Sequence, residues 1–552
     1  MKRRVLKSVL ACALTLSLLT ACGGQQAEAP QDKVENGNGV APQQNNQQST
    51  DIALQSYEDT FTERDLRQVA DLDAAIYVEL SEEGISIDGR GAQAEGKVVT
   101  FTDEGTYVIS GSLSGGQLVV DAAKEDKVQL VLEGVSVTND SSAALYVKQA
   151  DKVFVTTGAG TDNSFETTGE FVDIDENTID GAVFSKDDII FNGEGSLNII
   201  CNADHGIVGK DDIKVTGGSI VVDAKGDGLQ ANDGIYIADG MVSVLNSYEG
   251  MEAQNIYVWN GDITIIAEDD GLNGAGGNDG SGLQSFGGNN PFEADLSCNV
   301  VIHGGALHVS ADGDGLDSNG NLVINGGEIY VNGPTNGGNG AIDFGGSGIM
   351  NGGVLVATGA DGMAENMSQG SGQCTMMVTL SNQMLEGELV VKDAAGNVIL
   401  SHTPEKRYNN AVISHPDLRV GETYTVSAGE ASAEVTFEST IYGQGMMNGG
   451  QGGFGGGHGG FDGNKGDGSF GGGKENGGQG GRGERPEMGE MPEGMELPEG
   501  MELPEGMTPP EGMEMPEGME MPEGMTPPEG MEMPEGMTPP EGMENMPQMP
   551  GV

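Results

Sequence analysis

Acidic residues recur at a fixed spacing along the centre of this 552-residue chain. Most lie in short glycine-ended turns such as "KGDGLQANDG". The glycines that end successive turns are Gly206, Gly228, Gly250, Gly271, Gly315, Gly340 and Gly362. Their steps are 22, 22, 21, 44, 25 and 22 residues. A period near 22 indicates a solenoid, and we interpret the step of 44 as two periods that contain an insertion around "NGAGGNDGSGLQSFGGNNPF".

Stacked coils would place equivalent residues above one another in columns. The first column is His205, Asp227, Glu249, Asp270, Asp314, Asn339 and Asp361. The second column, three residues further along, is Val208, Gln230, Glu252, Asn273, Asp317 and Ile342. Further aspartates fall in the next few positions, namely Asp211, Asp212, Asp233 and Asp343.

Such columns of carboxylates favour the binding of calcium. Coils stack about 4.8 Å apart, and two carboxylates at that distance repel by roughly 1 kcal/mol in water and by more near a protein surface. Opposite oxygen ligands of calcium lie about 4.6–5.2 Å apart, which suits this spacing, whereas magnesium spans only about 4.2 Å. The predicted metal ligands are Asp227, Asp233, Glu249, Asp270, Asn273, Asp314, Asp317 and Asp343. The alternative is a hydrated acidic edge that binds no metal.

Each period has the pattern of turn, strand, Gly-Gly turn and strand, as in "IKVTGGSIVVDA". Alternation within the strands predicts that Ile220 and Val222 point inward. A repeat this short with no helix matches one coil of a parallel β-helix, whereas calcium-binding nonapeptide repeats are much shorter. The elements that would position the acidic turns are therefore short stacked strands.

The same alignment predicts surfaces that could bind sugar. One outward column is Ile190, Lys214, Tyr236, Tyr257, Val301 and Val323. Trp259 points the same way, so Tyr236, Tyr257 and Trp259 could form an aromatic platform for pyranose rings. The alternative is that the insertion at 269–297 folds over these rings and buries them. His308 and Tyr330, on neighbouring coils, form a second predicted contact for sugar.

Charge and the N-terminus restrict the possible partners. The chain has 25 Lys and Arg against 86 Asp and Glu, a net charge of −61, which excludes nucleic acid as a natural partner. "MKRR" and the short apolar stretch after it are typical of a signal peptide. "LTAC", which ends at Cys22, matches a bacterial lipobox, although an ordinary signal peptide with a chance cysteine is the alternative. We therefore predict a secreted protein, lipid-anchored at Cys22 on the outer face of the bacterial membrane.

The predicted fold class is all-β: a right-handed parallel β-helix with coils of about 22 residues, a small antiparallel β capping segment and a disordered tail. The predicted segments are a lipoprotein signal peptide (1–21), a flexible tether (22–56), an N-terminal cap (57–96), the parallel β-helix (97–368), the C-terminal antiparallel β segment (369–441), a Gly-rich linker (442–485) and a disordered Pro/Glu/Gly/Met repeat tail (486–552).

Several stretches resemble a known family. They are "GDGLDSNGNLVINGGEIYVNGPTNGGNGAIDFGGSGIMNGGVLVATGADGMA", "TYVISGSLSGGQLVVDA" and "VQLVLEGVSVTNDSSAALYVKQADKVFVT". They resemble secreted bacterial carbohydrate-binding proteins with a right-handed, calcium-binding parallel β-helix, whose fold is similar to family 9 polysaccharide lyases. The resemblance covers roughly residues 75–440. It implies that the protein binds calcium and plant-type polysaccharides, including cellulose-like chains and acidic chains such as polygalacturonate.

Two other functions remain open from the sequence. A uronate polysaccharide lyase would use calcium and a lysine base, for which Lys186 and Lys210 are candidates because each lies beside aspartates. A surface adhesin or spacer without glycan specificity, which would contact cell-surface components, would also suit a long solenoid with a repetitive tail.

Overall fold

The computed structural model describes residues 52, 54–172, 177–275 and 294–443. The predicted signal peptide, the lipidation site at Cys22, most of the tether, nearly all of the Gly-rich linker and the repeat tail lie outside these residues. The described residues form strands almost throughout, with one short helix, α1 (Tyr57–Thr60). No helix in this part of the chain is long and apolar enough to cross a bilayer.

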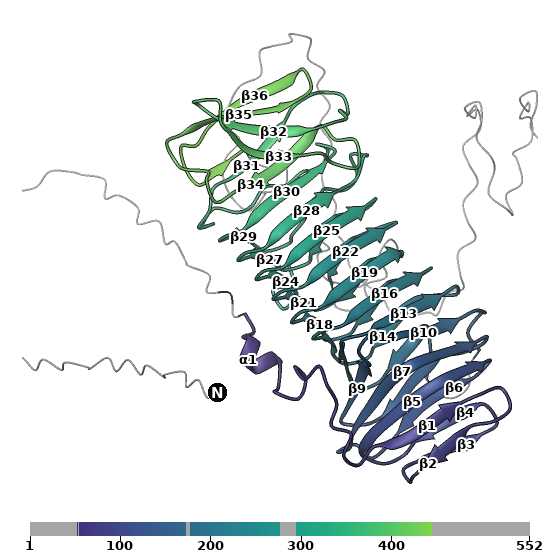
Figure 1. The fold of residues 1–552 in the computed structure, drawn as a ribbon. Coiled ribbons are helices and arrows are strands. Elements are labelled where there is room, and N and C mark those ends of the chain that lie inside the picture. Colours follow the sequence, from purple (N-terminus) through teal and green to yellow (C-terminus); the bar gives the residue numbers. More distant parts are fainter. Residues whose placement is uncertain (1–51, 53, 173–176, 276–293, 444–552) are drawn as a thin grey trace, which may run out of the picture. The chain divides into compact units, whose positions relative to one another are not determined.

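The body of the protein is a parallel β-helix with three faces, and Figure 1 shows its strands stacked coil upon coil. Face one consists of β9 (Lys152–Thr157), β12 (Asp188–Gly193), β15 (Ile213–Val215), β18 (Gly234–Ile237), β21 (Asn255–Val258), β24 (Asn299–Ile302), β27 (Asn321–Ile324) and β29 (Gly348–Met350). Face two consists of β10 (Asp162–Thr167), β13 (Ser196–Cys201), β16 (Ser219–Ala224), β19 (Met241–Asn246), β22 (Asp262–Ala267), β25 (Ala306–Ala311), β28 (Glu328–Asn332) and β30 (Val354–Gly359). Face three consists of β4 (Val98–Phe101), β6 (Gln117–Asp121), β8 (Leu145–Gln149), β11 (Gly181–Ser185), β14 (His205–Gly209), β17 (Leu229–Ala231), β20 (Met251–Ala253), β23 (Leu272–Gly274) and β26 (Leu316–Ser318).

In the first coils, the long strands β5 (Gly105–Ser114) and β7 (Lys127–Asn139) continue faces one and two, because β7 pairs in parallel with β5, β9 and β10. The strands β1 (Ile76–Leu80), β2 (Ser86–Asp88) and β3 (Ala92–Glu95) lie at the N-terminal end. At the C-terminal end, β31 (Thr375–Thr379), β34 (Asn410–Ser414) and β37 (Ile441–Tyr442) join the helix sheet. An antiparallel sheet follows, formed by β32 (Leu389–Asp393), β33 (Val398–His402), β35 (Thr423–Ala428) and β36 (Ala431–Thr436). The predicted all-β class, with a parallel solenoid and an antiparallel segment after it, is confirmed.

The coils stack in the register that the 22-residue period predicts. Lys214 lies opposite Tyr236, and Tyr236 lies opposite Tyr257. The inward residues Ile220 and Val222 are 2% and 0% exposed and belong to one continuous apolar core. Burial of such side chains is the main term that stabilises the stack.

Two details of the predicted alignment are wrong. The step of 44 residues is one coil and not two, because β23 pairs directly with β26, which places Leu272 opposite Leu316. That coil carries an insertion about as long as a whole period. In the last coils the alignment is shifted by one residue, because Leu316 is bridged to Ile342. Asp343 therefore lies beside Asp317, in the place where the sequence alignment put Ile342.

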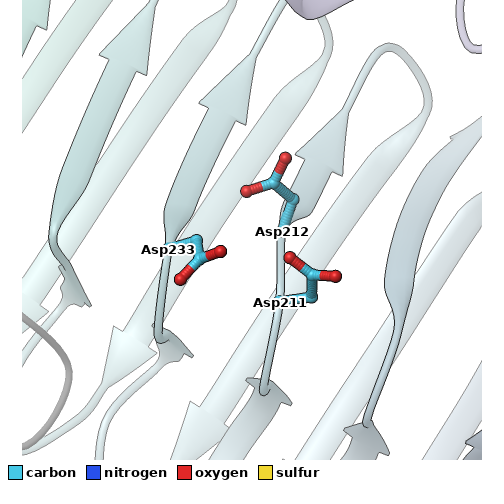
Figure 2. Close-up of side chains that lie close together, drawn as sticks. All are labelled: Asp211, Asp212 and Asp233. Carbon is cyan, nitrogen blue, oxygen red and sulfur yellow. The ribbon is translucent and has the colours of Figure 1, made fainter.

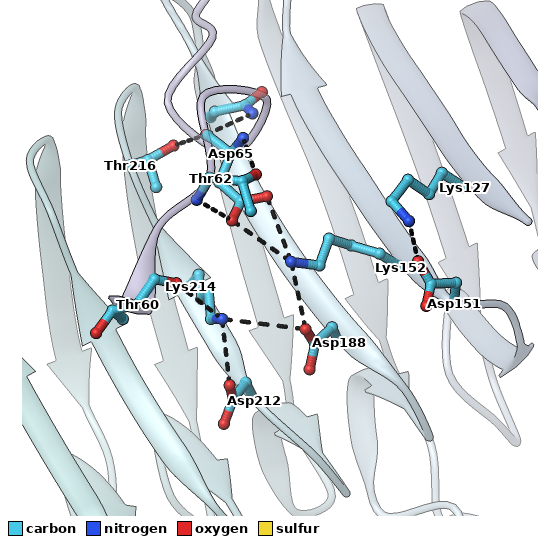
Figure 3. A network of polar contacts seen from close by, with 11 residues as sticks. Thr60, Thr62, Asp65, Lys127, Asp151, Lys152, Asp188, Asp212, Lys214 and Thr216 are labelled. Atoms are coloured by element: carbon cyan, nitrogen blue, oxygen red, sulfur yellow. Dashed lines mark hydrogen bonds and ion pairs between the residues drawn. The ribbon is translucent and has the colours of Figure 1, made fainter. Parts of the chain in front are cut away.

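The N-terminal segment, residues 54–68, lies along face one and crosses several coils. Lys214 Nζ donates to Thr60 O at 3.2 Å, and Thr216 Oγ1 donates to Asp65 O. Gly193 N donates to Gln68 Oε1 at 3.1 Å. Figure 3 shows Lys152 between Asp65 and Asp188 beneath this segment. The segment is thus a bound part of the β-helix and covers a strip of its surface.

Candidate metal and carbohydrate sites

The acidic ladder is a stack of polar side chains on the strands of face three and in the turns beside them. Its members are Asp227, Gln230, Glu249, Glu252, Asp270, Asn273, Asp314, Asp317 and Asp343. Asp227 Oδ1 accepts a hydrogen bond from Glu249 N at 3.1 Å, and Asp270 Oδ1 accepts one from Asp314 N at 2.6 Å. These carboxylates therefore use one oxygen to bind the backbone of the next coil.

Amide side chains connect the two columns of the ladder. Gln230 Nε2 donates to Glu252 Oε2 at 2.8 Å and to Asp227 Oδ2 at 3.2 Å. Asn273 Nδ2 donates to Glu249 Oε2 at 3.0 Å. At the N-terminal end of the ladder, His205 Nδ1 lies 3.0 Å from Asp227 Oδ2. Seven of the eight predicted metal ligands are brought into this ladder, and Asp233 is not.

Burial of so many carboxyl groups has a large electrostatic cost. Glu249 is 2% exposed, and burial, followed by the charges of Asp227 and Glu252, raises its pKa to about 9. Burial raises the pKa of Asp314 to about 7, and burial together with Asp270 raises that of Asp317 well above its usual value. Such groups must either hold protons or neutralise their charge with a cation.

The C-terminal end of the ladder has a donor set that fits a hard cation. Asp314, Asp317 and Asp343 each offer one oxygen, and these oxygens lie within 4.8 Å of one another. Glu365 is 8% exposed, and its buried Oε2 has no hydrogen-bond partner in the described residues. Burial, followed by the charges of Asp343 and Asp314, raises the pKa of Glu365 to about 7, so it lies near the cluster. An all-oxygen set of this kind is the type that calcium prefers.

The sequence reasoning missed Glu365. The residue follows the last glycine-ended turn, in "ADGMAENM", so an extension of the acidic column by one further turn could have found it. Asn273 is a second residue with an oxygen that could bind an ion, because its Oδ1 atom is buried and has no hydrogen-bond partner in the described residues. Buried polar atoms without partners are rare in folded proteins, so each calls for an explanation such as a bound ion.

The Asp211 cluster is a separate group of carboxylates, formed by Asp211, Asp212 and Asp233. Figure 2 shows these side chains together at the starts of neighbouring strands. One oxygen of each lies within 4.8 Å of the others. Burial, followed by the charges of Asp188 and Asp212, raises the pKa of Asp211 to about 6. Lys214 Nζ lies 3.2 Å from Asp212 Oδ2 and already neutralises part of this charge.

The predicted aromatic platform is wrong for two of its three residues. Tyr236 is 3% exposed and Tyr257 is 1% exposed. The cover is the N-terminal segment, because Phe61, Tyr57 and Leu54 pack in the same cluster. The ring faces are also occupied, since Tyr257 stacks on Trp259 with centroids 5.4 Å apart. Trp259 remains half-buried and stacks in turn on His303 at 5.3 Å.

The second predicted pair, His308 and Tyr330, does come together. Their rings stack with centroids 5.3 Å apart, and the exposed His308 forms the open end of the stack. His402, on β33 of the antiparallel sheet, also stacks on Tyr330, with ring centroids 4.5 Å apart. His308 is the exposed member of this group, so it is the residue that a sugar ring could reach.

Within the described residues, neither candidate lysine of the lyase alternative forms an ion pair with a carboxylate of the ladder. Lys186 is exposed. Lys210 Nζ lies 3.8 Å from Asp180 Oδ2 and 5.4 Å from the centre of the Phe184 ring. Lys214 is the lysine that contacts the Asp211 cluster, and its Nζ is covered by Thr60.

Comparison with known proteins identifies relatives of the central part of the chain. Residues 95–337 match the model of a family described as carbohydrate-binding domain-containing protein. A protein of that description from Acetivibrio thermocellus is 38% identical over 136 residues, which are 24% of this chain and 48% of the relative. The chain thus spans about half the length of this curated relative. A solved structure is described as the polysaccharide lyase-like protein from C. thermocellum, a gadolinium derivative, and is 26% identical to this chain. The match covers 50% of this chain and 96% of the solved one, with a TM-score of 0.36.

Proposed function

We propose that the protein is a calcium-dependent, carbohydrate-binding surface lipoprotein that recognises acidic or plant-type polysaccharides, such as polygalacturonate or cellulose-like chains. The match of residues 95–337 to a carbohydrate-binding domain family supports the general role in carbohydrate binding. The observation that supports the calcium dependence is the set of mutually close oxygens of Asp314, Asp317 and Asp343, together with the charges of Asp343 and Asp314 acting on the buried Glu365.

The two acidic sites would have different tasks. Asp314, Asp317, Asp343 and Glu365 would hold a structural calcium ion, because this site is largely buried. The Asp211 cluster includes the exposed Asp233, so an ion held there would keep coordination positions open to solvent. Calcium in such a position can accept further oxygen ligands, including a uronate carboxylate. The exposed end of the His308 and Tyr330 stack supplies an additional contact for a sugar ring.

The proposal is tested by titrating polygalacturonate and a soluble cellulose oligomer into the mature protein, with calcium and then with excess EDTA. We expect binding with calcium and a large loss of affinity for polygalacturonate in EDTA. Equal binding in both buffers would exclude the calcium dependence, and no binding to either chain would favour a spacer. The lyase alternative predicts an unsaturated product from polygalacturonate, which the same mixtures would reveal by ultraviolet absorbance.

The structural calcium site is tested by a double substitution, Asp317→Asn with Asp343→Asn. Removal of two charged ligands is expected to weaken calcium binding by about tenfold or more, since ligand charge sets the affinity of oxygen sites. Calorimetric titration with calcium measures the effect. Asp262→Asn, an exposed carboxylate on face two, is the matched control and is expected to leave calcium binding unchanged. Unaltered affinity in the double variant would contradict the assignment.

The lipid anchor remains part of the proposal and rests on the sequence alone. Cells grown with a labelled fatty acid are expected to incorporate the label into the wild-type protein and not into a Cys22→Ala variant. Equal labelling of the two proteins would exclude lipidation at Cys22.

A further inference from the structure

A small cavity lies where the N-terminal segment meets the first coils of the β-helix. Its volume is about 170 Å³. The residues that line it are Arg64, Arg67, Val69, Ala70, Asp71, Thr106 and Gln129. At about 30 Å³ per water molecule, this space holds a few waters or one group of the size of a sugar carboxylate with part of its ring. Neither acidic site described above shares a residue with it.

Two arginines in one cavity are unusual in a protein with 25 basic and 86 acidic residues. Within the described residues, neither guanidinium lies within ion-pair distance of a carboxylate. Asp65, which lies beside Arg64 in the chain, has other contacts: it accepts from Thr62 N at 2.9 Å and pairs with Lys152 at 3.4 Å. Among the residues that the structure describes, the two guanidinium groups therefore have no ion-pair partner in the cavity.

The Arg64 guanidinium is half-buried, whereas Arg67 is exposed. Burial lowers the pKa of Arg64, the charge of Glu104 opposes this effect, the charge of Arg67 lowers the pKa further, and the charge of Asp65 opposes it. Arg64 is also held in place, since its guanidinium carbon lies 4.4 Å above the centre of the Phe154 ring. Stacking of this kind fixes the plane of an arginine and leaves its edge free to donate hydrogen bonds.

The remaining walls suit a sugar acid. Gln129 is buried, and its Nε2 donates to Thr156 Oγ1 at 3.1 Å, so its amide is fixed in orientation. Thr106 adds a half-buried hydroxyl, and Val69 and Ala70 add apolar surface. Two cationic side chains and the single anionic side chain of Asp71 leave a net positive charge in the lining.

We propose that Arg64 and Arg67 bind the carboxylate of a uronic acid residue in a site that does not need calcium. The guanidinium groups can donate paired hydrogen bonds to the two oxygens of a carboxylate, the geometry for which arginine is best suited. This inference rests on the proposed recognition of acidic polysaccharide and adds a second, metal-free mode of binding. It predicts a preference for uronate chains over neutral chains that persists after calcium is removed.

The test is a titration of the mature protein with a galacturonate oligomer in excess EDTA, repeated with the carboxyl-reduced neutral oligomer. We expect binding of the acidic oligomer and little binding of the neutral one. An Arg64→Gln, Arg67→Gln variant is expected to bind the acidic oligomer at least about tenfold more weakly, the loss typical of a hydrogen bond to a charged group. Arg407→Gln, at an exposed arginine of the C-terminal segment, is the matched control and is expected to leave this binding unchanged.

The outcomes separate this inference from the proposed function. If the wild-type protein binds the acidic oligomer in calcium but not at all in EDTA, the arginine site is overturned and the calcium-dependent function stays in place. Metal-free binding that the arginine variant loses would support the arginine site, whatever the effect of calcium. Equal affinities of wild type and variant in EDTA would overturn it. If the double variant does not fold, the single variant Arg67→Gln is used, because this side chain is exposed. The inference then requires that Arg67→Gln weakens the binding of the acidic oligomer measurably.

Discussion

In excess EDTA, the free energy of unfolding is expected to decrease as the pH rises from about 5 to 9. The folded protein raises the pKa of Glu249 to about 9 and those of Asp314 and Glu365 to about 7, from ordinary values of 4.5, 3.8 and 4.5. Over this range the folded state therefore binds more protons than the unfolded state. Each such group lowers the stability by about 1.4 kcal/mol per pH unit between its two pKa values. Urea denaturation at a series of pH values measures the slope.

Calcium is expected to flatten or reverse this trend, because the ion binds the ionised carboxylates that the metal-free fold disfavours. A Glu249→Gln variant is the control in EDTA. It removes the carboxyl group whose pKa is raised to about 9, so the stability of the variant should fall less steeply above pH 7, where Asp314 and Glu365 no longer contribute. Stability in EDTA that rises between pH 5 and 9 would contradict the assignment of buried, protonated carboxyl groups.

The second large effect is expected from Asp65, whose side chain is fully buried under the N-terminal segment. Lys152 Nζ lies 3.4 Å from an oxygen of Asp65 and 3.4 Å from an oxygen of Asp188. Figure 3 shows this lysine between the two carboxylates. Asp65→Ala leaves the ammonium of Lys152 with one of these two carboxylates, and loss of a buried partner of this kind costs about 3–5 kcal/mol. We expect a loss near the lower end of that range, because Asp188 remains, and urea denaturation measures it.

A double variant distinguishes the ion pair from simple packing. Asp65→Leu with Lys152→Met removes both charges and is expected to recover most of the stability, as is common when a buried pair is replaced by apolar side chains. The fluorescence of Trp259, the only tryptophan in the chain, reports on the N-terminal segment because Phe61 packs edge-on against it at 5.2 Å. An Asp65→Ala variant that is as stable as the wild type would show that the ion pair contributes nothing.

The sequence predicted the repetitive part of the structure well because one constraint, the coil period, fixes many positions at once. The placement of Lys214, Tyr236 and Tyr257 in one column follows from that period and is confirmed. The two alignment errors arise where the period is interrupted. The first error arises because an insertion of nearly one period has the same length as a true coil. The second arises because one additional residue in a later coil places Asp343 where the alignment put Ile342.

The aromatic prediction was wrong for a different reason. The period shows which side chains point outward, and Tyr236 and Tyr257 do lie on the outward column. Residues 54–66 of the N-terminal segment cover these two rings, and this segment has no repeat and is distant in the sequence. A periodic sequence pattern cannot predict such a contact. Glu365 was missed because the second column of the alignment ended at Ile342, one coil before Glu365.

The docked N-terminal segment also affects how the solenoid unfolds. Coils of a repeat protein contact only their neighbours, so a stack can open from one end and stop at any coil. Here one stretch of chain contacts five consecutive strands of face one: Lys152 on β9, Asn192 on β12, Lys214 on β15, Tyr236 on β18 and Tyr257 on β21. These coils therefore gain a shared restraint that nearest-neighbour stacking does not provide, and they should lose their structure in a single cooperative step.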